Sequence, residues 1–326
     1  MASDPHLSDK SADSPHYLGI EIGGTKLQLG VGTAQGVLHQ KVRSEVDRQA
    51  GAEGIQREIE RLLPDLLSNH PVRAIGVGFG GPVLWRNGRV ACSHHISGWS
   101  GFEMADWLHR LSGLPAYVEN DANAAALAEA TVGAGQGADP VLWMNAGSGI
   151  GGGLVVDGRI YHGAAPGEVE LGHLRLDREG TITEDLASGW SIDARVRDAA
   201  RRNPDGPLAR IIREGGHARA EARALAEALT EGDPDALSLL NQTAETLAYA
   251  LSHAAHLLHP EVVVFGGGVS LLGEPLRNRI AAALPRWLME AFHPGPRIVL
   301  AALGEDSVLL GAVCVAHQRS CAKREQ

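Results

Sequence analysis

The chain has 326 residues, a formal net charge of −10, 44% hydrophobic residues and 4% aromatic residues. The negative charge argues against nucleic acid or an anionic membrane surface as a partner, and the few aromatic residues argue against a surface on which bases stack. Three cysteines are too few for a disulfide framework or a cysteine-rich metal site, so we expect a reducing, cytoplasmic setting. No apolar run reaches the roughly 18–20 residues that cross a bilayer, and the length allows about two domains.

The first half of the chain predicts an α/β domain after a short tail. Residues 1–16 are rich in serine, aspartate and proline and lack an apolar core, so we expect a disordered tail that is neither a signal peptide nor a DNA-binding module. Apolar runs and helical periodicity predict the remaining elements. In chain order these are strands over 17–31 and 37–43, a helix over 51–69 that Pro64 bends or stops, a buried strand from residue 72, a helix over 101–113, a strand over 114–120 and an alanine-rich helix over 121–133.

The second half begins by repeating the pattern of the first. Residues 140–163 again consist of an apolar strand, a glycine turn and a second apolar strand, as at the start of the chain. A hairpin that recurs at domain-sized spacing indicates two related α/β halves. The elements expected after it are helices over 186–203, 217–231 and 234–259, a strand over 260–270, a helix over 274–290, a strand over 297–302 and a helix over 306–320.

Three glycine loops follow predicted buried strands: Gly23-Gly24-Thr25, the loop from Gly147 to Gly153, and Gly266-Gly267-Gly268. Each could be a plain turn, because glycine tolerates the backbone angles of tight turns. Each could also cradle phosphate with its backbone N–H groups, at the strand ends where α/β sheets place ligands. The recurrence of such loops favours the second interpretation.

Asp121 is the best catalytic candidate in the sequence. It lies where a predicted strand meets a predicted helix, and a helix N-terminus favours an ionised carboxylate. Enzymes that transfer phosphoryl groups to alcohols commonly use an aspartate to accept the hydroxyl proton. The alternative interpretation is a helix N-cap, a position at which aspartate and asparagine are both favoured.

Further polar residues have two interpretations. Glu168, Glu170, His173 and Glu184 suit hydrogen bonds to several sugar hydroxyls, or they form a solvated acidic loop. Histidines also gather beside Cys92 and along the helix over 234–259, but zinc sites usually need four well-placed ligands. We therefore expect no metal at these histidines.

Taken in order, these motifs resemble those of the sugar kinases of the ROK family (repressor, open reading frame, kinase). The resemblance runs from about residue 17 to about residue 317. The motifs that carry it are IGGTK (22–26), GFGGPV (78–83), ISGWSG (96–101), ENDANAAALAE (119–129), NAGSGIGGG (145–153), GEVELGH (167–173) and PEVVVFGGGVS (260–270).

The resemblance implies a fold, a reaction and partners. The fold would be the two-lobed actin-like ATPase fold, a duplicated ribonuclease H-like α/β unit with a cleft between the lobes. The first lobe would span 17–120 and be completed by a C-terminal helix over 304–320, and the larger second lobe would span 121–303. The activity would be ATP- and Mg²⁺-dependent phosphorylation of a hexose-like sugar, and the family suggests a homodimer.

The resemblance also assigns roles to individual residues. It makes Asp121 the general base for the sugar hydroxyl. The residues that would hold the sugar are Asn120, Glu170, His173, Glu184, Gly81 and His95. The residues that would hold ATP and its phosphates are Glu21, Gly23, Gly24, Thr25, Lys26, Gly147, Ser148, Gly149, Gly267 and Gly268.

Three departures from the family pattern affect these expectations. Glu21 stands where the family usually has aspartate, which would alter the handling of Mg²⁺ and phosphate. His95 stands where the family usually has asparagine, which leaves the identity of the sugar open. The segment after His173 contains none of the cysteines of the family's structural zinc loop, so we expect no structural zinc.

Two rival functions follow from the same motifs. A catalytically silent regulator that binds sugar and nucleotide is suggested by Glu21 and His95, and Asp121 argues against it. An ATPase that acts on a protein partner would need no sugar, and the GEVELGH segment argues against that function.

Overall fold

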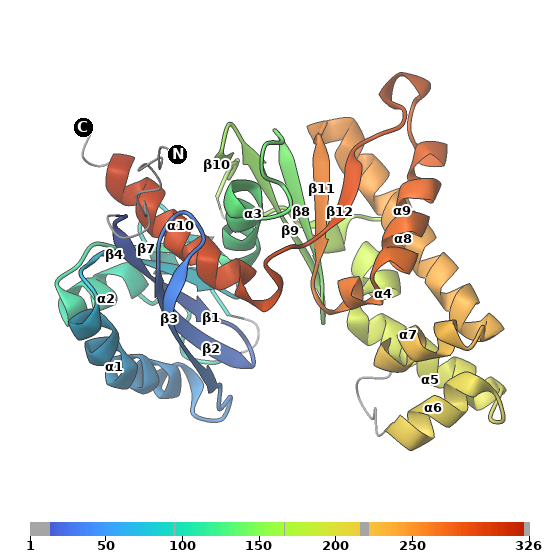
Figure 1. Ribbon diagram of the computed structural model, residues 1–326, viewed down its shortest axis with the longest axis horizontal. Helices are drawn as coiled ribbons and strands as arrows, with labels where there is room; N and C mark the ends of the chain where they lie inside the picture. Colours follow the sequence, from blue (N-terminus) through green and yellow to red (C-terminus); the bar gives the residue numbers. More distant parts are fainter. Residues whose placement is uncertain (1–13, 94–95, 166, 216–221, 323–326) are drawn as a thin grey trace, which may run out of the picture. The chain divides into compact units, whose positions relative to one another are not determined.

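The computed structural model describes residues 14–93, 96–165, 167–215 and 222–322. The chain divides into two units, Met1–Ala124 with Val308–Gln326, and Ala125–Ser307. Each unit has a mixed five-stranded sheet with helices packed on it (Figure 1). The predicted α/β class with two lobes is thereby confirmed. Residues 1–13 of the expected tail lie outside the described residues.

The sheet of the first unit has the strand order β3-β2-β1-β4-β7. β1, β2 and β3 form an antiparallel meander, whereas β4 and β7 run parallel to β1. β1 begins one residue before the expected strand and turns into β2 at Gly23-Gly24, as predicted. The strands are β1 (His16–Ile22), β2 (Lys26–Gly32), β3 (Leu38–Glu45), β4 (Val72–Phe79) and β7 (Ala116–Asn120), with a small hairpin of β5 (Val83–Leu84) and β6 (Arg89–Val90) beside them.

Helices cover both faces of this sheet (Figure 1). One face packs against α1 (Gly51–Asn69) and α2 (Met104–Ser112), where isoleucine and leucine side chains form the core. α1 continues through Pro64, so this proline does not end the helix. The other face packs against α10 (Ser307–Ala322), close to the predicted final helix.

Glycines allow α10 to lie unusually close to its neighbours. A Cβ atom at Gly76 of β4 would lie 1.9 Å from the carbonyl oxygen of Ala312. A Cβ at Gly311 would lie 1.9 Å from the carbonyl oxygen of Ala124, in α3 (Asp121–Val132). Because these atoms are backbone, no side chain fits without moving the helix, and the two glycines fix the position of α10.

The sheet of the second unit has the order β10-β9-β8-β11-β12 and repeats the pattern of the first. β8, β9 and β10 are antiparallel, and β11 runs parallel to β8 and β12. The predicted second glycine-turn hairpin is confirmed at β8–β9. The strands are β8 (Val141–Ala146), β9 (Ile150–Val156), β10 (Arg159–Ile160), β11 (Val262–Gly266) and β12 (Arg297–Leu300).

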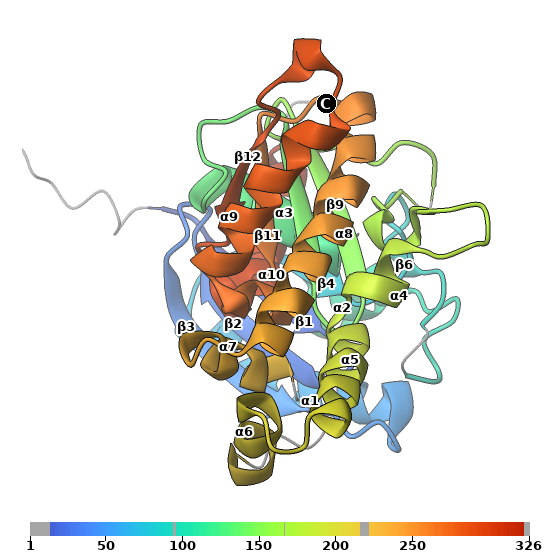
Figure 2. The same ribbon diagram turned by 90° about the vertical axis from the view of Figure 1, so that its right-hand side faces the viewer.

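The helices of the second unit differ from the prediction in three places. The helix expected over 186–203 is two helices that meet at Ser188, the one over 274–290 ends at Ala283, and α6 was not predicted. α8 and α9 lie side by side (Figure 2), and the buried face of α8 belongs to the same hydrophobic core as residues of strands β8 and β11. The elements are α4 (Thr183–Ala187), α5 (Gly189–Arg202), α6 (Pro207–Gly215), α7 (Ala222–Thr230), α8 (Pro234–Leu258) and α9 (Glu274–Ala283), with short 3-10 helices η1 (Leu171–His173), η2 (Gly268–Leu272), η3 (Leu284–Trp287), η4 (Glu290–Phe292) and η5 (Gly304–Asp306).

The buried carboxylate of Glu129 ties the end of α3 to the segment before α10. Its Oε2 accepts hydrogen bonds from the backbone N–H groups of Ala134 (2.8 Å) and Ala302 (3.2 Å). Its Oε1 accepts one from the N–H of Leu303 (3.0 Å). Charge-assisted bonds of this kind are stronger than those between neutral groups, so one side chain holds two chain segments that are distant in sequence.

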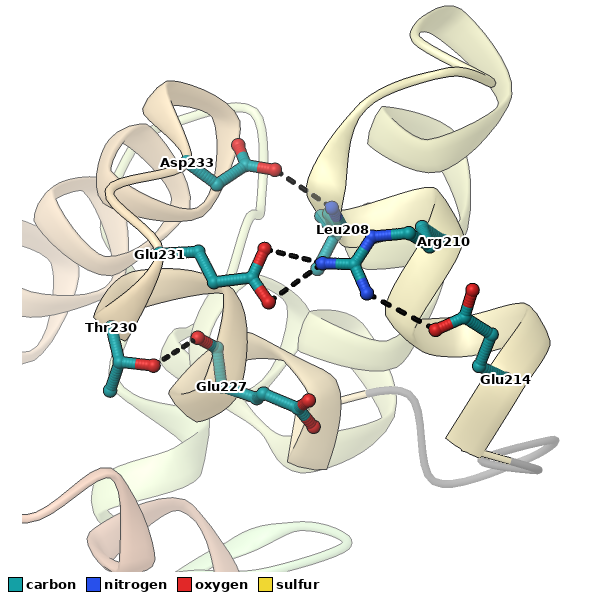
Figure 3. A network of polar contacts seen from close by, with 7 residues as sticks. All are labelled: Leu208, Arg210, Glu214, Glu227, Thr230, Glu231 and Asp233. Atoms are coloured by element: carbon teal, nitrogen blue, oxygen red, sulfur yellow. Dashed lines mark hydrogen bonds and ion pairs between the residues drawn. The ribbon is translucent and has the colours of Figure 1, made fainter.

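A second buried carboxylate, that of Asp233, joins α6 to α8 (Figure 3). Its Oδ2 accepts the backbone N–H of Leu208 at 2.8 Å. Its Oδ1 caps α8 by accepting the N–H groups of Asp235 (2.7 Å) and Ala236 (3.1 Å). Beside it, the exposed guanidinium of Arg210 pairs with the carboxylates of Glu231 and Glu214. The buried aspartate, rather than the exposed ion pairs, holds these helices together.

We predict that Asp233→Ala lowers the free energy of unfolding by about 2–3 kcal/mol, because it removes a helix cap and leaves the buried N–H of Leu208 without an acceptor. Urea unfolding followed by circular dichroism measures the change. The matched control, Asp205→Ala, replaces an exposed aspartate in the loop before α6. Equal stability of the two variants would contradict this role for Asp233.

Candidate functional site

In the first unit, Glu21 lies near the end of β1 with its carboxylate engaged on both oxygens. The residue is 5% exposed. Its Oε1 lies 3.0 Å from the ammonium of Lys26, and its Oε2 accepts a hydrogen bond from the amide of Gln28 at 2.7 Å. Both partners lie on β2, so an ion pair and a hydrogen bond join strands β1 and β2 beside their turn. Lys26, expected at the nucleotide, is the partner of Glu21 here.

The turn between β1 and β2 is a closed hairpin. Gly23 donates its N–H to the carbonyl of Lys26 at 3.0 Å, and Thr25 accepts a hydrogen bond from the N–H of Val46 at 3.0 Å. The carbonyl of Gly24 accepts one from the guanidinium of Arg48 at 2.8 Å. The turn geometry is therefore confirmed, and phosphate binding by this turn stays a prediction.

Asn120 and Asp121 lie where β7 becomes α3, and the structure distinguishes their roles. Asn120 is the N-cap, because its Oδ1 accepts the N–H groups of Ala122 (2.9 Å) and Asn123 (3.1 Å). Asp121 is the first residue of the helix and half-buried, and its Oδ1 also accepts the N–H of Ala122 at 2.9 Å. The predicted capping role thus belongs mainly to Asn120. The carboxylate of Asp121 sits in the positive end of the helix dipole.

The loop after β4 lies beside these two residues. A Cβ atom at Gly80 would lie 3.5 Å from Oδ2 of Asp121, so the carboxylate lies beside the backbone of Gly80. Gly80 donates its N–H to the carbonyl of Ile22 at 2.9 Å, and the amide of Asn120 donates to the carbonyl of Gly81 at 3.2 Å. The carboxyl ends of three parallel strands, β1, β4 and β7, therefore meet around Asp121, where α/β sheets place ligands.

In the second unit, the turn between β8 and β9 is held from outside by Glu184. The carboxylate Oε2 of Glu184 accepts the N–H of Ile150 at 2.6 Å, and a Cβ at Gly149 would lie 2.5 Å from this oxygen. Gly147 donates its N–H to Gly149 at 2.8 Å and accepts that of Gly189, at the start of α5, at 2.7 Å. The sequence assigned Glu184 to the sugar. In the structure Glu184 positions the glycine turn. The sequence did not indicate this role, because Glu184 lies 34 residues after Ile150.

The third glycine loop follows β11. Gly267 has a φ of 85°, and a Cβ there would lie 2.5 Å from the carbonyl oxygen of Ala146, so both its angle and its surroundings require glycine. Gly268 has nothing within 4 Å of its Cβ position. The loop thus packs against the end of β8 and presents an open backbone at Gly268.

A cavity of about 490 Å³ connects these two glycine loops in the second unit. Trp190, at the start of α5, is 64% exposed, and Leu271, in η2, is 79% exposed. Glycine backbone thus lies beside a large aromatic face and apolar side chains, which suits a flat apolar group with a polar extension. No pattern in the sequence indicated that Trp190 borders this cavity. The lining residues are Gly147, Ser148, Gly189, Trp190, Ile192, Asp193, Ala222, Arg223, Ala226, Gly268, Val269, Leu271 and Leu272.

His173 ends the short helix η1, which packs against β9, and Glu170 directly precedes that helix. Both residues are exposed, and His173 donates its backbone N–H to the carbonyl of Glu170 at 3.1 Å. Between them, a Cβ at Gly172 would lie 2.3 Å from the carbonyl oxygen of Ile150 and 3.3 Å from Oε2 of Glu184. Gly172 of η1 therefore lies beside Glu184, and the joint binding of a sugar by Glu170, His173 and Glu184 stays a prediction. His95 lies outside the described residues.

Within the ranges that the structure describes, no three His, Cys, Asp or Glu side chains are grouped to hold a metal ion. The expected lack of structural zinc stays a prediction. Among the helices of the same ranges, none combines the length and the apolar character needed to cross a membrane.

Comparison with known proteins places these elements in a family. A model of the ROK family matches residues 17–319 of the chain. A glucokinase from Halalkalibacterium halodurans is 30% identical over 316 residues, which cover 93% of this chain and 95% of that protein.

Solved structures agree with this match. A ROK family glucokinase from Streptomyces griseus, in complex with glucose and AMPPNP, is 30% identical and superposes with a TM-score of 0.80, covering 93% of this chain and 99% of that one. The ROK hexokinase from Thermus thermophilus is 31% identical with a TM-score of 0.78, covering 94% and 99%.

Proposed function

Because the chain belongs to the ROK family and is a sugar kinase, we propose that it transfers the γ-phosphoryl group of ATP to a hydroxyl group of a hexose-like sugar, with Asp121 as the general base. The observation that carries this proposal is the position of the Asp121 carboxylate. It lies at the N-terminus of α3, at the carboxyl ends of three parallel strands, with glycine backbone beside it.

The environment of Asp121 supports its role as a base. The dipole of α3 and the N–H of Ala122 favour the ionised carboxylate, which is the form that accepts a proton. Oδ2 lies beside the backbone of Gly80, at the strand ends where we place the sugar hydroxyl. In the reaction Asp121 would accept the hydroxyl proton while the sugar oxygen attacks the γ-phosphorus and ADP departs.

The sugar would be held by polar groups, two of which have side chains fixed by hydrogen bonds. The side chain of Asn120 is fixed by two hydrogen bonds that cap α3 and by a third to the carbonyl of Gly81. The carboxylate of Glu184 is fixed by the N–H of Ile150. Glu170, just before η1, and His173, at its end, present exposed polar side chains, and we assign His95 to the same ligand. Carboxylate, amide and imidazole groups together match the donors and acceptors of a sugar.

ATP would bind at the glycine loops and the cavity beside them. The cavity bordered by Trp190 and Leu271 suits the adenine ring, and the backbone of Gly147, Ser148 and Gly149 would face the phosphates. The S. griseus glucokinase binds AMPPNP, which supports a nucleotide here. In the first unit, the turn with Gly23, Gly24 and Thr25 would screen the transferred phosphoryl group.

Mg²⁺ would supply charge neutralisation on the phosphates, and Glu21 is the side chain suited to hold it. The carboxylate is buried and of the right chemistry, but both oxygens already have protein partners in Lys26 and Gln28. Mg²⁺ commonly keeps several waters and binds proteins through one or two carboxylates and the substrate phosphates, so contact through water fits this arrangement.

The engagement of Glu21 by Lys26 also favours a second candidate, a protein that binds sugar and nucleotide as a regulator with weak or no turnover. The arrangement around Asp121 favours the kinase. The expected homodimer and cytoplasmic location stay predictions.

Asp121→Asn tests the proposed chemistry. We expect kcat to fall by about 10²- to 10⁴-fold, because an amide cannot accept the hydroxyl proton, while the Kd of the sugar changes little. Coupled ADP release and isothermal titration measure the two quantities. Asp106→Asn, an exposed aspartate in α2, is the control. If Asp121→Asn keeps wild-type kcat, Asp121 is not the base.

Trp190→Ala tests the nucleotide cavity. Loss of one aromatic stacking surface, about 1 kcal/mol, should raise the Kd of ATP about 5-fold and leave that of the sugar unchanged. Titration of both ligands measures this. Leu257→Ala, which removes a side chain that is 77% exposed on α8, should change neither. If the ATP affinity of Trp190→Ala is unchanged, the adenine ring does not stack on Trp190.

A further inference from the structure

We propose that Arg319, near the end of α10, is a positioning residue for phosphoryl transfer, because it holds the buried carboxylate of Glu119 and thereby the start of the helix that carries Asp121. The inference rests on the proposed role of Asp121. Arg319 belongs to none of the motifs that the sequence singled out, and it lies far from them along the chain.

Glu119 organises the backbone on both sides of the proposed base. Its side chain is 1% exposed, and its Oε1 accepts hydrogen bonds from the backbone N–H of Asn120 and the amide of Asn123, each at 3.1 Å. Asn120 and Asn123 flank Asp121 in sequence, and Asn120 is the N-cap of α3. Any shift of the Glu119 carboxylate therefore moves the residues that set the direction of Asp121.

Arg319 provides the cation for this carboxylate. Its Nη2 lies 3.6 Å from Oε2 of Glu119. Its guanidinium stacks on the ring of Trp85, with the central carbon 4.2 Å from the ring centroid. Burial lowers the pKa of Arg319, and the charge of Glu119 opposes that effect. An arginine stays charged even so, and stacking fixes its plane, which a lysine could not reproduce.

Packing holds Arg319 in register with Glu119. Gly76 and Gly311 let α10 lie against β4 and α3 at backbone contact, so the helix cannot slide without a clash. β7, which carries Glu119, is the direct neighbour of β4 in the sheet. Both residues therefore belong to one compact unit, in which α10 brings Arg319 within reach of Glu119.

Removing Arg319 would take away a cation that lies 3.6 Å from the buried carboxylate of Glu119. Loss of a partner charge inside a protein is costly, so we expect Glu119 to bind a proton or to shift its carboxylate. Either change alters the acceptor for Asn120 and Asn123. A displacement of about 1 Å in a catalytic group can lower the rate about 10²-fold, so the effect should appear in kcat.

The test compares Arg319→Met with the double variant Glu119→Gln/Arg319→Met. We expect Arg319→Met to lower kcat by about 10- to 100-fold with both KM values within threefold of wild type. Glutamine keeps an oxygen that accepts both hydrogen bonds and carries no charge, so the double variant should recover most of the lost kcat. Arg319→Lys should lie between wild type and Arg319→Met.

The controls separate this proposal from a general loss of stability and from the role of Asp121. Arg110→Met, an exposed arginine in α2, should keep wild-type kcat, and kcat is measured at temperatures well below each variant's Tm. Asp121→Asn runs in the same assay: if it is active, the proposed base fails, whatever Arg319 does. A kcat of Arg319→Met within twofold of wild type overturns the positioning role alone.

The double variant keeps the test decisive. If it folds but is no faster than Arg319→Met, the link through Glu119 is wrong. If Arg319→Met does not fold, a folded double variant with kcat more than tenfold below wild type overturns the proposal, and one near wild type supports it.

Discussion

The hydrogen bonds at the start of α3 are the constraint on which the proposed chemistry depends. Asn120 caps the helix, and the buried carboxylate of Glu119 accepts a hydrogen bond from the backbone N–H of Asn120. Together they leave the carboxylate of Asp121 at the positive end of the helix dipole, against the bare backbone of Gly80. The arrangement needs no unusual residue at the site itself, only a buried carboxylate behind it that accepts hydrogen bonds from Asn120 and Asn123.

The second unit uses the same principle for a different purpose. Two of the three residues in its turn, Gly147 and Gly149, have no side chains. Glu184 accepts the N–H of Ile150 and Gly189 donates its N–H to Gly147, and these bonds hold the turn. The glycines leave backbone accessible to a ligand, and the carboxylate makes that backbone rigid. Preorganised backbone of this kind stabilises developing charge without reorganisation during the reaction, which is what phosphoryl transfer requires.

The sequence predicted the two sheets and their glycine loops because strand and turn patterns are local. It did not predict α6, whose position depends on the buried Asp233 that accepts the N–H of Leu208. The candidate base, Asp121, was found for the same local reason. The partners that position it were not, because Arg319 reaches Glu119 only through tertiary packing, and Trp190 borders the cavity only once the glycine loops are folded.

The most direct test of the central claim is sugar-dependent ADP formation by the wild-type protein, measured over hexoses, amino sugars and ketoses with ATP and Mg²⁺. The account predicts ADP release only when an accepted sugar is present, with one sugar phosphate formed per ADP. Binding of sugar and nucleotide without any product would contradict it and indicate a regulator. ADP release that needs no sugar would contradict it in favour of an ATPase.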